Sequence, residues 1–519
     1  GIAVDIPVWK SENCVQCNRC AYVCPHAVIR PVALTEEELA KAPEGTEAID
    51  MIGMPGLKFT MTVSAYDCTG CGSCANVCPV NNAGKKAPAL VMTSFDDETA
   101  KEQEKYDYLV QLAEKQEVLD KFKISTVKGS QFRKPYLEFS GACAGCGETP
   151  YAKLVTQLFG DRMYIANATG CSSIWGNSSP STPYTTNAKG QGPAWANSLF
   201  EDNAEFGYGM LLAQRAIRDG LKAKVEAVVA EGKDEAVKEA GQEWLDTFSV
   251  GATNGAATDK LIAALEACGC DAAKEILAQK NYLSKKSQWI FGGDGWAYDI
   301  GFGGVDHVLA SGRDINVMVF DTEVYSNTGG QSSKATKTGA TAQFAAGGKE
   351  TKKKDLAGMA MTYGYVYVAQ IAMGADFNQT VKAIAEAEAY PGPSLIIAYA
   401  PCINHGIKKG MSKAQTEEQL AVECGYWNNF RYNPAAEGDK FSLDSKAPKA
   451  EGYQDFLNGE VRYNALKRAN PAKADKLFAL NEQEAMERYD YLNKLVTVYA
   501  AEKEDRKSTR LNSSHQLIS

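Results

Sequence analysis

Eight of the 15 cysteines lie within residues 14–78, in two runs that share one spacing. Each run reads C-x2-C-x2-C-x3-C-P, so the segment is an internal repeat. Three thiolates on one tightly wound loop can face three corners of an iron–sulfur cube, and a fourth cysteine that has turned away into a helix can reach a second cube. The runs are Cys14, Cys17, Cys20 and Cys24, followed by Cys68, Cys71, Cys74 and Cys78.

This spacing is typical of electron-transfer proteins with two [4Fe–4S] clusters, and it predicts that the runs exchange their fourth ligands. Zinc and disulfides fit less well, because zinc sites seldom use four cysteines so close together and disulfides are rare in a reducing cytosol. One cluster is expected on Cys14, Cys17, Cys20 and Cys78. The other is expected on Cys68, Cys71, Cys74 and Cys24.

A second group of cysteines begins in the glycine-rich stretch GACAGCGE, residues 141–148. Cys143 and Cys146 form a C-x2-C half-site, which could hold a cluster or a zinc ion or act as a redox pair. A metal or cluster needs two further ligands. The candidates for these are Cys171 in another glycine-rich turn, Cys402 at the end of an apolar strand, and Cys424.

Three other potential ligands are expected to hold no metal. We interpret Cys268 and Cys270 as a C-x-C pair in the middle of a helix, where the geometry suits a cube poorly. His405 is the only one of the 4 histidines near a candidate site. We interpret it as a hydrogen-bonded histidine of the core or surface rather than as a ligand.

A third stretch could bind a phosphate and a cation. Residues 290–301 predict an apolar strand, a Gly-Asp-Gly turn and a helix, and the glycines let backbone N–H groups approach an anion. Asp294 offers an oxygen to a hard cation such as Mg2+. A second strand, residues 315–320, leads to Thr322, 28 positions after Asp294. A lone Gly-Asp-Gly is often only a tight turn, and the polar strand end at this distance strengthens the prediction.

The elements that position these groups suggest two domains. Residues 1–115 are expected to form an α+β ferredoxin-like domain, with a strand at 59–63. The charged residues 97–123 lack glycine and proline and predict one exposed helix across the boundary. Beyond it, apolar runs at 317–320 and 394–398 predict buried strands of a parallel sheet with helices between them, an α/β architecture.

The α/β domain is expected to occupy residues 116–505. Within it, residues 220–285 are rich in alanine, lysine and glutamate and predict a helical insertion. Residues 506–519 are polar and lack helical periodicity, so we expect a non-native or disordered tail.

Composition narrows the class of protein further. The net charge of −9 and the absence of a long Lys/Arg block argue against binding to nucleic acid. There is no apolar run of 18 residues and no charged-then-apolar leader, so we expect neither a membrane span nor a signal peptide, and a cytoplasmic location. The first residue is glycine, so the natural start is expected upstream.

Several long motifs resemble the pyruvate:ferredoxin oxidoreductase family, also called pyruvate synthase or pyruvate:flavodoxin oxidoreductase. The resemblance is to the C-terminal portion of the family, covers residues 5–500, and includes the double cysteine run. The other motifs are ACAGCGETPY at 142–151, ATGCSSIWG at 168–176, GGDGWAYDIGFGG at 292–304 and DTEVYSNTGGQSSKAT at 321–336.

The resemblance implies a thiamine diphosphate-binding fold, three [4Fe–4S] clusters, thiamine diphosphate and Mg2+. The third, proximal cluster would be held by Cys143, Cys146, Cys171 and Cys402. Mg2+ would be bound by the side chains of Asp294 and Thr322 and the carbonyl of Val324. Thiamine enzymes usually carry an Asn pair where this chain has Asp321-Thr322, which is a departure from the general pattern.

The resemblance also implies which residues surround the organic cofactor. Asn327 would face the substrate, and it and Glu148 would be the catalytic residues. Contacts to thiamine diphosphate would come from Glu148, Cys171, Gly293, Asp294, Gly295, Trp296, Thr322, Glu323, Val324, Tyr325, Ser326 and Asn327.

By the same resemblance, the activity would be oxidative decarboxylation of pyruvate with coenzyme A to acetyl-CoA and CO2. Electrons would pass through the three clusters to ferredoxin or flavodoxin. Members are usually longer, so the chain is expected to be a fragment of a homodimeric enzyme. N-terminal domains that complete the cofactor site, including its activating glutamate, would be missing, and the chain alone would not turn over a 2-oxo acid.

Other functions remain open from the sequence. A pure electron-transfer subunit of the polyferredoxin type would have no use for the Gly-Asp-Gly and DTEVYSNTGGQ motifs. A non-redox thiamine decarboxylase would have no use for the cysteine repeat. An oxidoreductase for another 2-oxo acid would use all of these parts.

Overall fold

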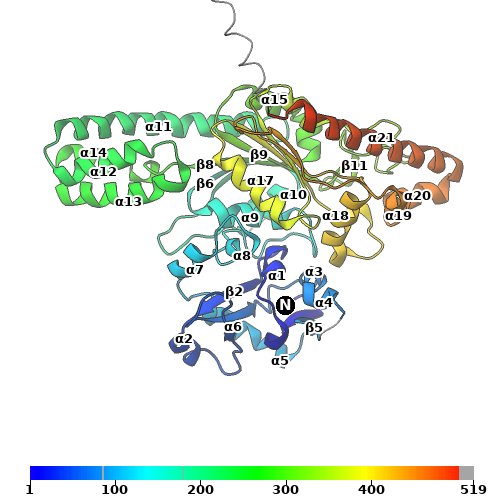
Figure 1. Ribbon diagram of the computed structural model, residues 1–519, viewed down its shortest axis with the longest axis horizontal. Coiled ribbons are helices and arrows are strands. Elements are labelled where there is room, and N and C mark those ends of the chain that lie inside the picture. Colours follow the sequence, from blue (N-terminus) through cyan, green and yellow to red (C-terminus); the bar gives the residue numbers. More distant parts are fainter. Residues whose placement is uncertain (85–86, 179–180, 502–519) are drawn as a thin grey trace, which may run out of the picture.

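The computed structural model describes residues 1–84, 87–178 and 181–501 (Figure 1). An N-terminal part lies beneath a larger α/β body, and a group of helices extends from one side of that body (Figure 1). No helix in these described ranges is long and apolar enough to cross a membrane. The expected tail, residues 506–519, lies outside the described residues.

An eight-stranded sheet forms the centre of the larger body, in the order β15-β14-β12-β13-β9-β8-β6-β7. From β12 to β7 neighbouring strands are parallel, whereas β14 and β15 add antiparallel pairs at one edge. The predicted strands lie in β9 and β13, so the mostly parallel α/β architecture is confirmed. The strands are β6 Met163–Ala168, β7 Ala194–Ser198, β8 Ser287–Gly293, β9 Ile315–Asp321, β12 Tyr367–Ile371, β13 Pro393–Tyr399, β14 Phe430–Tyr432 and β15 Phe441–Leu443.

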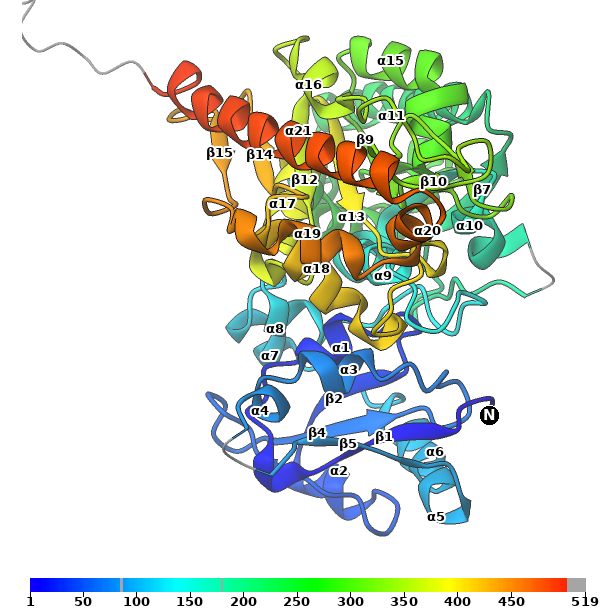
Figure 2. The same ribbon diagram turned by 90° about the vertical axis from the view of Figure 1, so that its right-hand side faces the viewer.

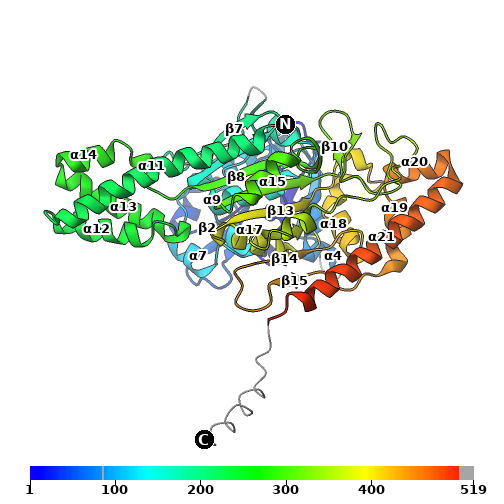
Figure 3. The ribbon, with the colours of Figure 1, turned by 90° about the horizontal axis from the view of Figure 1, so that it is seen from above.

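Both faces of this sheet are covered by helices, which explains why its strands are continuous apolar runs. In β9, Val317 and Val319 belong to the core beneath α15, while Met318 and Phe320 belong to the core beneath α9 and α17. Figure 3 shows the body from above, with α11, α15 and α17 in view. The main covering helices are α9 Thr149–Phe159, α15 Phe302–Ala310, α16 Leu356–Met361, α17 Phe377–Ala389, α18 Ala414–Glu423, α19 Tyr453–Asn458, α20 Val461–Ala469 and α21 Pro471–Val498.

The helices at the side form the expected insertion, with a core of their own around the buried Trp244. The first of them begins before residue 220, the expected start of the insertion. Leu211 packs on the sheet, while Leu221 and Val225, farther along the same helix, join the core of the insertion. The helices are α11 Asn203–Glu231, α12 Glu235–Asp246, α13 Gly251–Cys268 and α14 Asp271–Leu277.

The C-x-C pair of this insertion does not lie in mid-helix, so that expectation is wrong. Cys268 is the last residue of α13, and Cys270 caps the N-terminus of α14. Gly269 between them has a φ of +60°, the left-handed conformation with which glycine commonly ends a helix.

The N-terminal part is a small α+β unit (Figure 2). Strand β4 contains the predicted strand at 59–63 and pairs with β2 and β3, while β1 pairs with β5. A short helix lies within each cysteine run, α1 in the first run and α3 in the second. The elements are β1 Asp5–Trp9, α1 Arg19–Tyr22, β2 Ile29–Leu34, α2 Glu36–Ala40, β3 Ile49–Asp50, β4 Lys58–Val63, α3 Ser73–Val77, α4 Pro79–Asn82 and β5 Leu90–Ser94.

The charged stretch 97–123 is not one exposed helix, and that expectation is also wrong. It forms three helices, with Tyr106, Leu109 and Val118 buried. The chain bends between helices because these few apolar side chains pack inward, and their burial outweighs the helical propensity of the charged residues. The helices are α5 Asp97–Ala100, α6 Glu102–Leu109 and α7 Gln116–Lys121.

Buried hydrogen bonds join the N-terminal unit to the larger body. Lys153 of α9 donates from Nζ to the carbonyl of Tyr22 at 3.0 Å. The hydroxyl of Tyr22 donates in turn to the carbonyl of Phe377 at 3.1 Å. Because Tyr22 lies between two cysteines of the first run, these bonds fix that run relative to the sheet.

Candidate functional site

Two small cavities in the N-terminal unit are each lined by four cysteines. The lining sets cross the two runs, because each contains three cysteines of one run and the fourth of the other. One cavity contains Cys14, Cys17, Cys20 and Cys78, and the other contains Cys68, Cys71, Cys74 and Cys24. The fourth cysteine of each run lies just after a helix, α1 or α3, rather than inside it as expected.

The chemistry of these cavities fits an iron–sulfur cluster. Burial raises the pKa of Cys68 to about 12 and raises the pKa values of Cys20 and Cys74. Thiols so desolvated give up their protons when cations lie among them. Within the described residues, no three His, Cys, Asp or Glu side chains are arranged around a single metal ion. A cube spreads its cysteines over separate iron atoms, so the donor sets fit a cube better than zinc.

The crossed sets make a prediction for Cys24. Its replacement by alanine should release the cluster held by the second run, although Cys24 belongs to the first run in sequence. Iron should fall by about four atoms per chain. Alkylation followed by peptide mapping should then find Cys68, Cys71 and Cys74 newly reactive.

A matched control is Cys424→Ala, because Cys424 is buried in the sheet core and its thiol donates to the carbonyl of Ala421 at 3.6 Å. This variant should keep all its iron. New reactivity at Cys14, Cys17 and Cys20 in the Cys24 variant would contradict the crossed assignment.

A third set of cysteines gathers at the edge of the sheet where the parallel strands end. The N–H of Gly147 donates to the carbonyl of Pro401 at 3.1 Å, which holds the loop of Cys143 and Cys146 against the segment of Cys402. Cys171 begins the short helix α10, Cys171–Ser173, just after β6. Cys171 follows β6 and Cys402 follows β13, and parallel strands end at one edge of a sheet, so these two distant positions meet there. Cys143 and Cys146 come from the loop before α9.

The thiols of this set influence one another electrostatically. Burial, together with the neighbouring Glu148 and Cys143, raises the pKa of Cys402 to about 12. Burial, then Glu148, Cys402 and Cys146, raise the pKa of Cys171. Cys424, the alternative fourth ligand considered from the sequence, lies in the core of the sheet and does not interact with these thiols.

A separate cavity opens at the same edge, where β6, β8 and β9 end. All residues expected to contact thiamine diphosphate except Glu323 line it. The sequence prediction missed five further lining residues, of which three adjoin Cys171 in the motif ATGCSSIWG and could have been found there. The missed residues are Thr169, Gly170, Ser172, Phe200 and Thr328.

Three oxygens in this cavity are arranged as neighbouring ligands of one small cation. The hydroxyl of Thr322 lies 3.0 Å from Asp294 Oδ1 and 3.0 Å from the carbonyl oxygen of Val324. Adjacent oxygens of an octahedral Mg2+ site, with bonds of 2.0–2.1 Å, are about 3 Å apart. Burial and the nearby Asp321 raise the pKa of Asp294, and a cation would reverse that shift. These residues therefore fit Mg2+.

Gly295 of the Gly-Asp-Gly turn lies against a tyrosine ring. A Cβ on Gly295 would lie 2.4 Å from the ring of Tyr325, so a larger residue there would displace that ring from the cavity wall. After the turn the chain continues as a π-helical segment, Gly295–Ile300. The strand–turn–helix order is that expected for a site that receives a phosphate on backbone N–H groups.

Glu323 points away from this cavity, which differs from the expectation that it contacts the cofactor. Its side chain is fully buried and forms ion pairs with Lys353 at 3.1 Å and Arg462 at 2.9 Å. Its φ of +59° is unusual for a non-glycine residue. Its neighbours Thr322 and Val324 line the cavity, whereas Glu323 does not. Glu323 therefore anchors the Thr322–Val324 turn from behind.

His405 also supports this turn. Its Nε2 hydrogen-bonds the carbonyl of Thr322 at 2.6 Å, and the ring is fully buried. Burial lowers the pKa of His405 to about 3, so the ring is neutral. This placement agrees with the interpretation of a hydrogen-bonded core histidine.

Glu148 lies between the cysteine set and the cavity. It is buried, and its carboxylate accepts a hydrogen bond from Trp175 Nε1 at 2.7 Å. Burial raises the pKa of Glu148 to about 7. A carboxyl group at this pKa can hold or release a proton near neutral pH.

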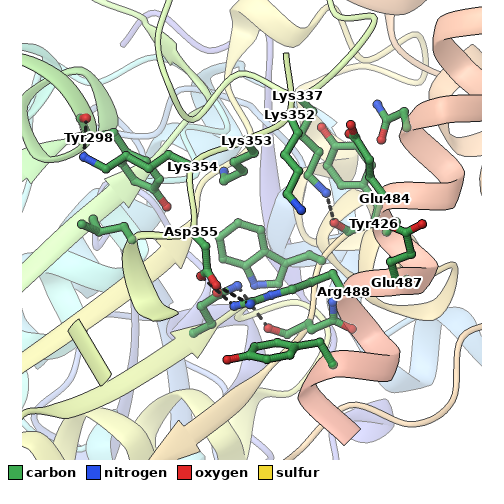
Figure 4. Close-up of a pocket in the computed structure, with 18 residues that line it drawn as sticks. Tyr298, Lys337, Lys352, Lys353, Lys354, Asp355, Tyr426, Glu484, Glu487 and Arg488 are labelled. Atoms are coloured by element: carbon green, nitrogen blue, oxygen red, sulfur yellow. Dashed lines mark hydrogen bonds and ion pairs between the residues drawn. The ribbon is translucent and has the colours of Figure 1, made fainter. Parts of the chain in front are cut away.

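A larger cavity, of about 410 Å³, shares no lining residue with this site (Figure 4). Lys352, Lys353 and Lys354 enter it from one loop, beside the ion pair of Asp355 and Arg488. Lys353 Nζ also contacts the carboxylate of Asp321 at 2.7 Å. The wall of the larger cavity thus braces the strand end that carries the candidate cation site.

Comparison with known proteins assigns both halves of this arrangement to families. Residues 13–82 match the family described as "4Fe-4S dicluster domain". Residues 252–398 match "Thiamine pyrophosphate enzyme, C-terminal TPP binding domain". The chain is 57% identical over 507 residues to the pyruvate:ferredoxin oxidoreductase of Moorella thermoacetica, a match that covers 95% of this chain. The chain belongs to the pyruvate:ferredoxin/flavodoxin oxidoreductases.

Other members of this family agree. The chain is 56% identical to the pyruvate-flavodoxin oxidoreductase of Enterobacter agglomerans and 53% identical to that of Klebsiella pneumoniae, over 96% and 95% of its length. It spans 42% of the length of each of these relatives. A solved 2-oxoglutarate:ferredoxin oxidoreductase from Magnetococcus marinus aligns with a TM-score of 0.30 and 15% identity, over 51% of this chain and 65% of that one, too low to support an argument.

Proposed function

We propose that this chain supplies the diphosphate-binding side of the thiamine site and the electron-transfer centres of an enzyme that oxidatively decarboxylates pyruvate. Coenzyme A would receive the acetyl group, and ferredoxin or flavodoxin would receive the electrons. The observation that carries the proposal is Cys171, which lines the candidate cofactor cavity and also belongs to the third cysteine set. A thiamine site and a redox centre therefore share a wall.

The residues of the cavity have distinct roles in this proposal. Asp294, Thr322 and Val324 would hold Mg2+ through the three convergent oxygens, and Mg2+ would bind the diphosphate. Thiamine diphosphate supplies the carbanion chemistry that 2-oxo acid decarboxylation needs. Asn327 would orient the substrate, and Glu148 would hold or release a proton at the wall shared with the cysteine set.

The three cysteine sets would hold three [4Fe–4S] clusters. The proximal set lies beside the cavity, and the two crossed sets lie in the N-terminal unit below it. The hydrogen bonds of Lys153 and Tyr22 hold that unit in place. This order would let electrons leave the cavity through the N-terminal unit toward the acceptor. We extend the proposal to a homodimer of the longer enzyme.

Two other functions are less well supported. A pure electron-transfer subunit would not need the three convergent oxygens at Asp294, Thr322 and Val324. An oxidoreductase for another 2-oxo acid would use the same site, but the high-identity relatives carry pyruvate in their names. Pyruvate is therefore the proposed substrate.

The function can be tested at Asn327, which lines the cavity. In an anaerobic preparation that contains this chain, pyruvate-dependent reduction of ferredoxin should fall about 100-fold in the Asn327→Ala variant, because a misplaced substrate reacts slowly. Binding of thiamine diphosphate should change much less. Stopped-flow absorbance of the acceptor gives the rate, and fluorescence titration gives the affinity.

The control is Asn378→Ala, an exposed residue at the start of α17 that should leave the rate unchanged. A wild-type preparation that binds thiamine diphosphate but fails to reduce ferredoxin, whichever 2-oxo acid is supplied, would argue against the proposed function. Reduction with 2-oxoglutarate but not pyruvate would move the proposal to another 2-oxo acid.

A further inference from the structure

The two cysteines at the end of the helical insertion lie close enough to react with each other. Cys268 Sγ and Cys270 Sγ are 2.8 Å apart. They line none of the cysteine cavities and lie at the α13–α14 junction, at the outer end of the insertion in both views (Figures 1 and 3). The function proposed above makes no use of them.

The backbone holds the two sulfurs together. Gly269, with a φ of +60°, reverses the chain after α13, and its N–H donates to the carbonyl of Leu265 at 3.1 Å. Cys270 is extended, with φ −71° and ψ 165°, and caps α14. A residue with a Cβ would resist the left-handed conformation at position 269, so the short turn depends on glycine. The juxtaposition of the sulfurs is therefore a property of the Cys-Gly-Cys sequence in this turn.

The two thiols differ in reactivity. Cys270 is exposed, whereas Cys268 is half-buried against the core of the insertion. The Cys268 thiol donates to Cys270 Sγ, and the N–H of Ala273 also points to that sulfur, and both interactions lower the pKa of Cys270. The same hydrogen bond raises the pKa of Cys268. Cys270 is thus the better nucleophile, with Cys268 placed to attack it second.

A metal site does not explain the pair. Two thiols provide half of a tetrahedral site, and no third His, Cys, Asp or Glu joins them in the part of the chain that the structure describes.

We propose that Cys268 and Cys270 are a reversible dithiol–disulfide pair that exchanges with low-molecular-weight disulfides such as glutathione disulfide. The Cys270 thiolate attacks one sulfur of that molecule, forms a mixed disulfide and releases one thiolate. Cys268 loses its proton and attacks Cys270 Sγ, which forms the intrachain disulfide and releases the second thiolate. In the net reaction, two cysteine thiols are oxidised, one external disulfide is reduced, and the two released thiolates take up the two protons to become thiols.

The small ring that joins two cysteines one residue apart is strained, and strained disulfides are readily reduced. The pair should therefore be a dithiol under the reducing conditions that the clusters need and a disulfide when the thiol pool becomes oxidised. Reversible disulfides of this kind are the usual form in reducing compartments.

The test uses the cluster-loaded chain, prepared anaerobically and then treated with glutathione disulfide. After acid quenching, alkylation with iodoacetamide and digestion with trypsin, both cysteines lie on one peptide, residues 261–274. We expect this peptide to lose all alkylation and to weigh two hydrogens less than its dithiol form. Dithiothreitol should restore full alkylation, with the iron content unchanged throughout.

Two variants separate the steps. Cys268→Ser should accumulate glutathione on Cys270, because no second thiol resolves the mixed disulfide. Cys270→Ser should react much more slowly at Cys268. Three results in the wild-type chain would overturn the proposal: both cysteines still alkylated after treatment, a persistent glutathione adduct on Cys270, or a disulfide between two chains. The peptide readout does not depend on the proposed enzymatic activity.

Discussion

Replacing Asp294 with alanine is expected to abolish Mg2+-dependent binding of thiamine diphosphate. Asp294 provides the only carboxylate among the three convergent oxygens, and a hard cation that bridges a diphosphate needs an anionic ligand. Loss of residues that merely orient metal ligands costs 10–100-fold in affinity, so loss of this ligand should cost more than about 100-fold. Calorimetric titration of thiamine diphosphate with and without Mg2+ measures the effect.

The matched control is Asp299→Ala, in the helical segment that follows. Asp299 does not line the cavity and pairs instead with Lys334 at 3.1 Å. The control should keep its affinity for the cofactor, and both variants should keep their iron. Equal cofactor affinity in the wild-type chain and the Asp294 variant would refute the assignment of this turn.

The second large effect is expected at Gly147. A Cβ at this position would lie 2.6 Å from both the nitrogen and the oxygen of Pro401, backbone atoms that cannot move independently. Gly147→Ala should therefore push the loop of Cys143 and Cys146 away from Cys402 and prevent assembly of the proximal cluster. Iron should fall from about 12 to about 8 atoms per chain, with the crossed clusters intact.

Gly141→Ala is a close control, because a Cβ there would meet no atom within 4 Å. It should bind as much iron as the wild-type chain. Full iron loading of the Gly147 variant would mean that contact between this loop and Pro401 is not needed for the cluster.

Local spacing predicted the crossed cysteine sets and the pairing of Asp294 with Thr322, whereas the proximal cysteine set and the other cofactor contacts were implied only by the family resemblance. Asp294 and Thr322 lie far apart in sequence, but each follows an apolar strand, and β8 and β9 are parallel neighbours. Strand ends of this kind meet at one edge of a sheet, so a motif after each strand is enough to bring the two residues together. The crossed cysteine sets follow equally from the spacing within each run.

The orientation of Glu323 could not be predicted in this way. Its left-handed backbone and its outward direction depend on ion pairs with Lys353 and Arg462, residues 30 and more positions away. Phe200 reaches the cavity from the segment after β7 and has no motif of its own. Contacts set by tertiary packing leave no short pattern in the sequence.

The two errors in secondary structure have different causes. The stretch 97–123 has the composition of one helix, but the burial of Tyr106, Leu109 and Val118 divides it. At the C-x-C pair a signal was present, because glycine commonly follows the last residue of a helix, and Gly269 does so here. A glycine in this position predicts the end of a helix, and therefore two cysteines at a helix junction.

The central claim is that a third iron–sulfur cluster lies beside the thiamine site, and iron analysis of the Cys143→Ser variant tests it most directly. Cys143 belongs to the proximal set but does not line the cofactor cavity. We predict about 12 iron atoms per wild-type chain and about 8 in the variant, with the affinity for thiamine diphosphate and Mg2+ largely retained. About 8 iron atoms in both chains would contradict the account, because the proximal cysteines would then hold no cluster.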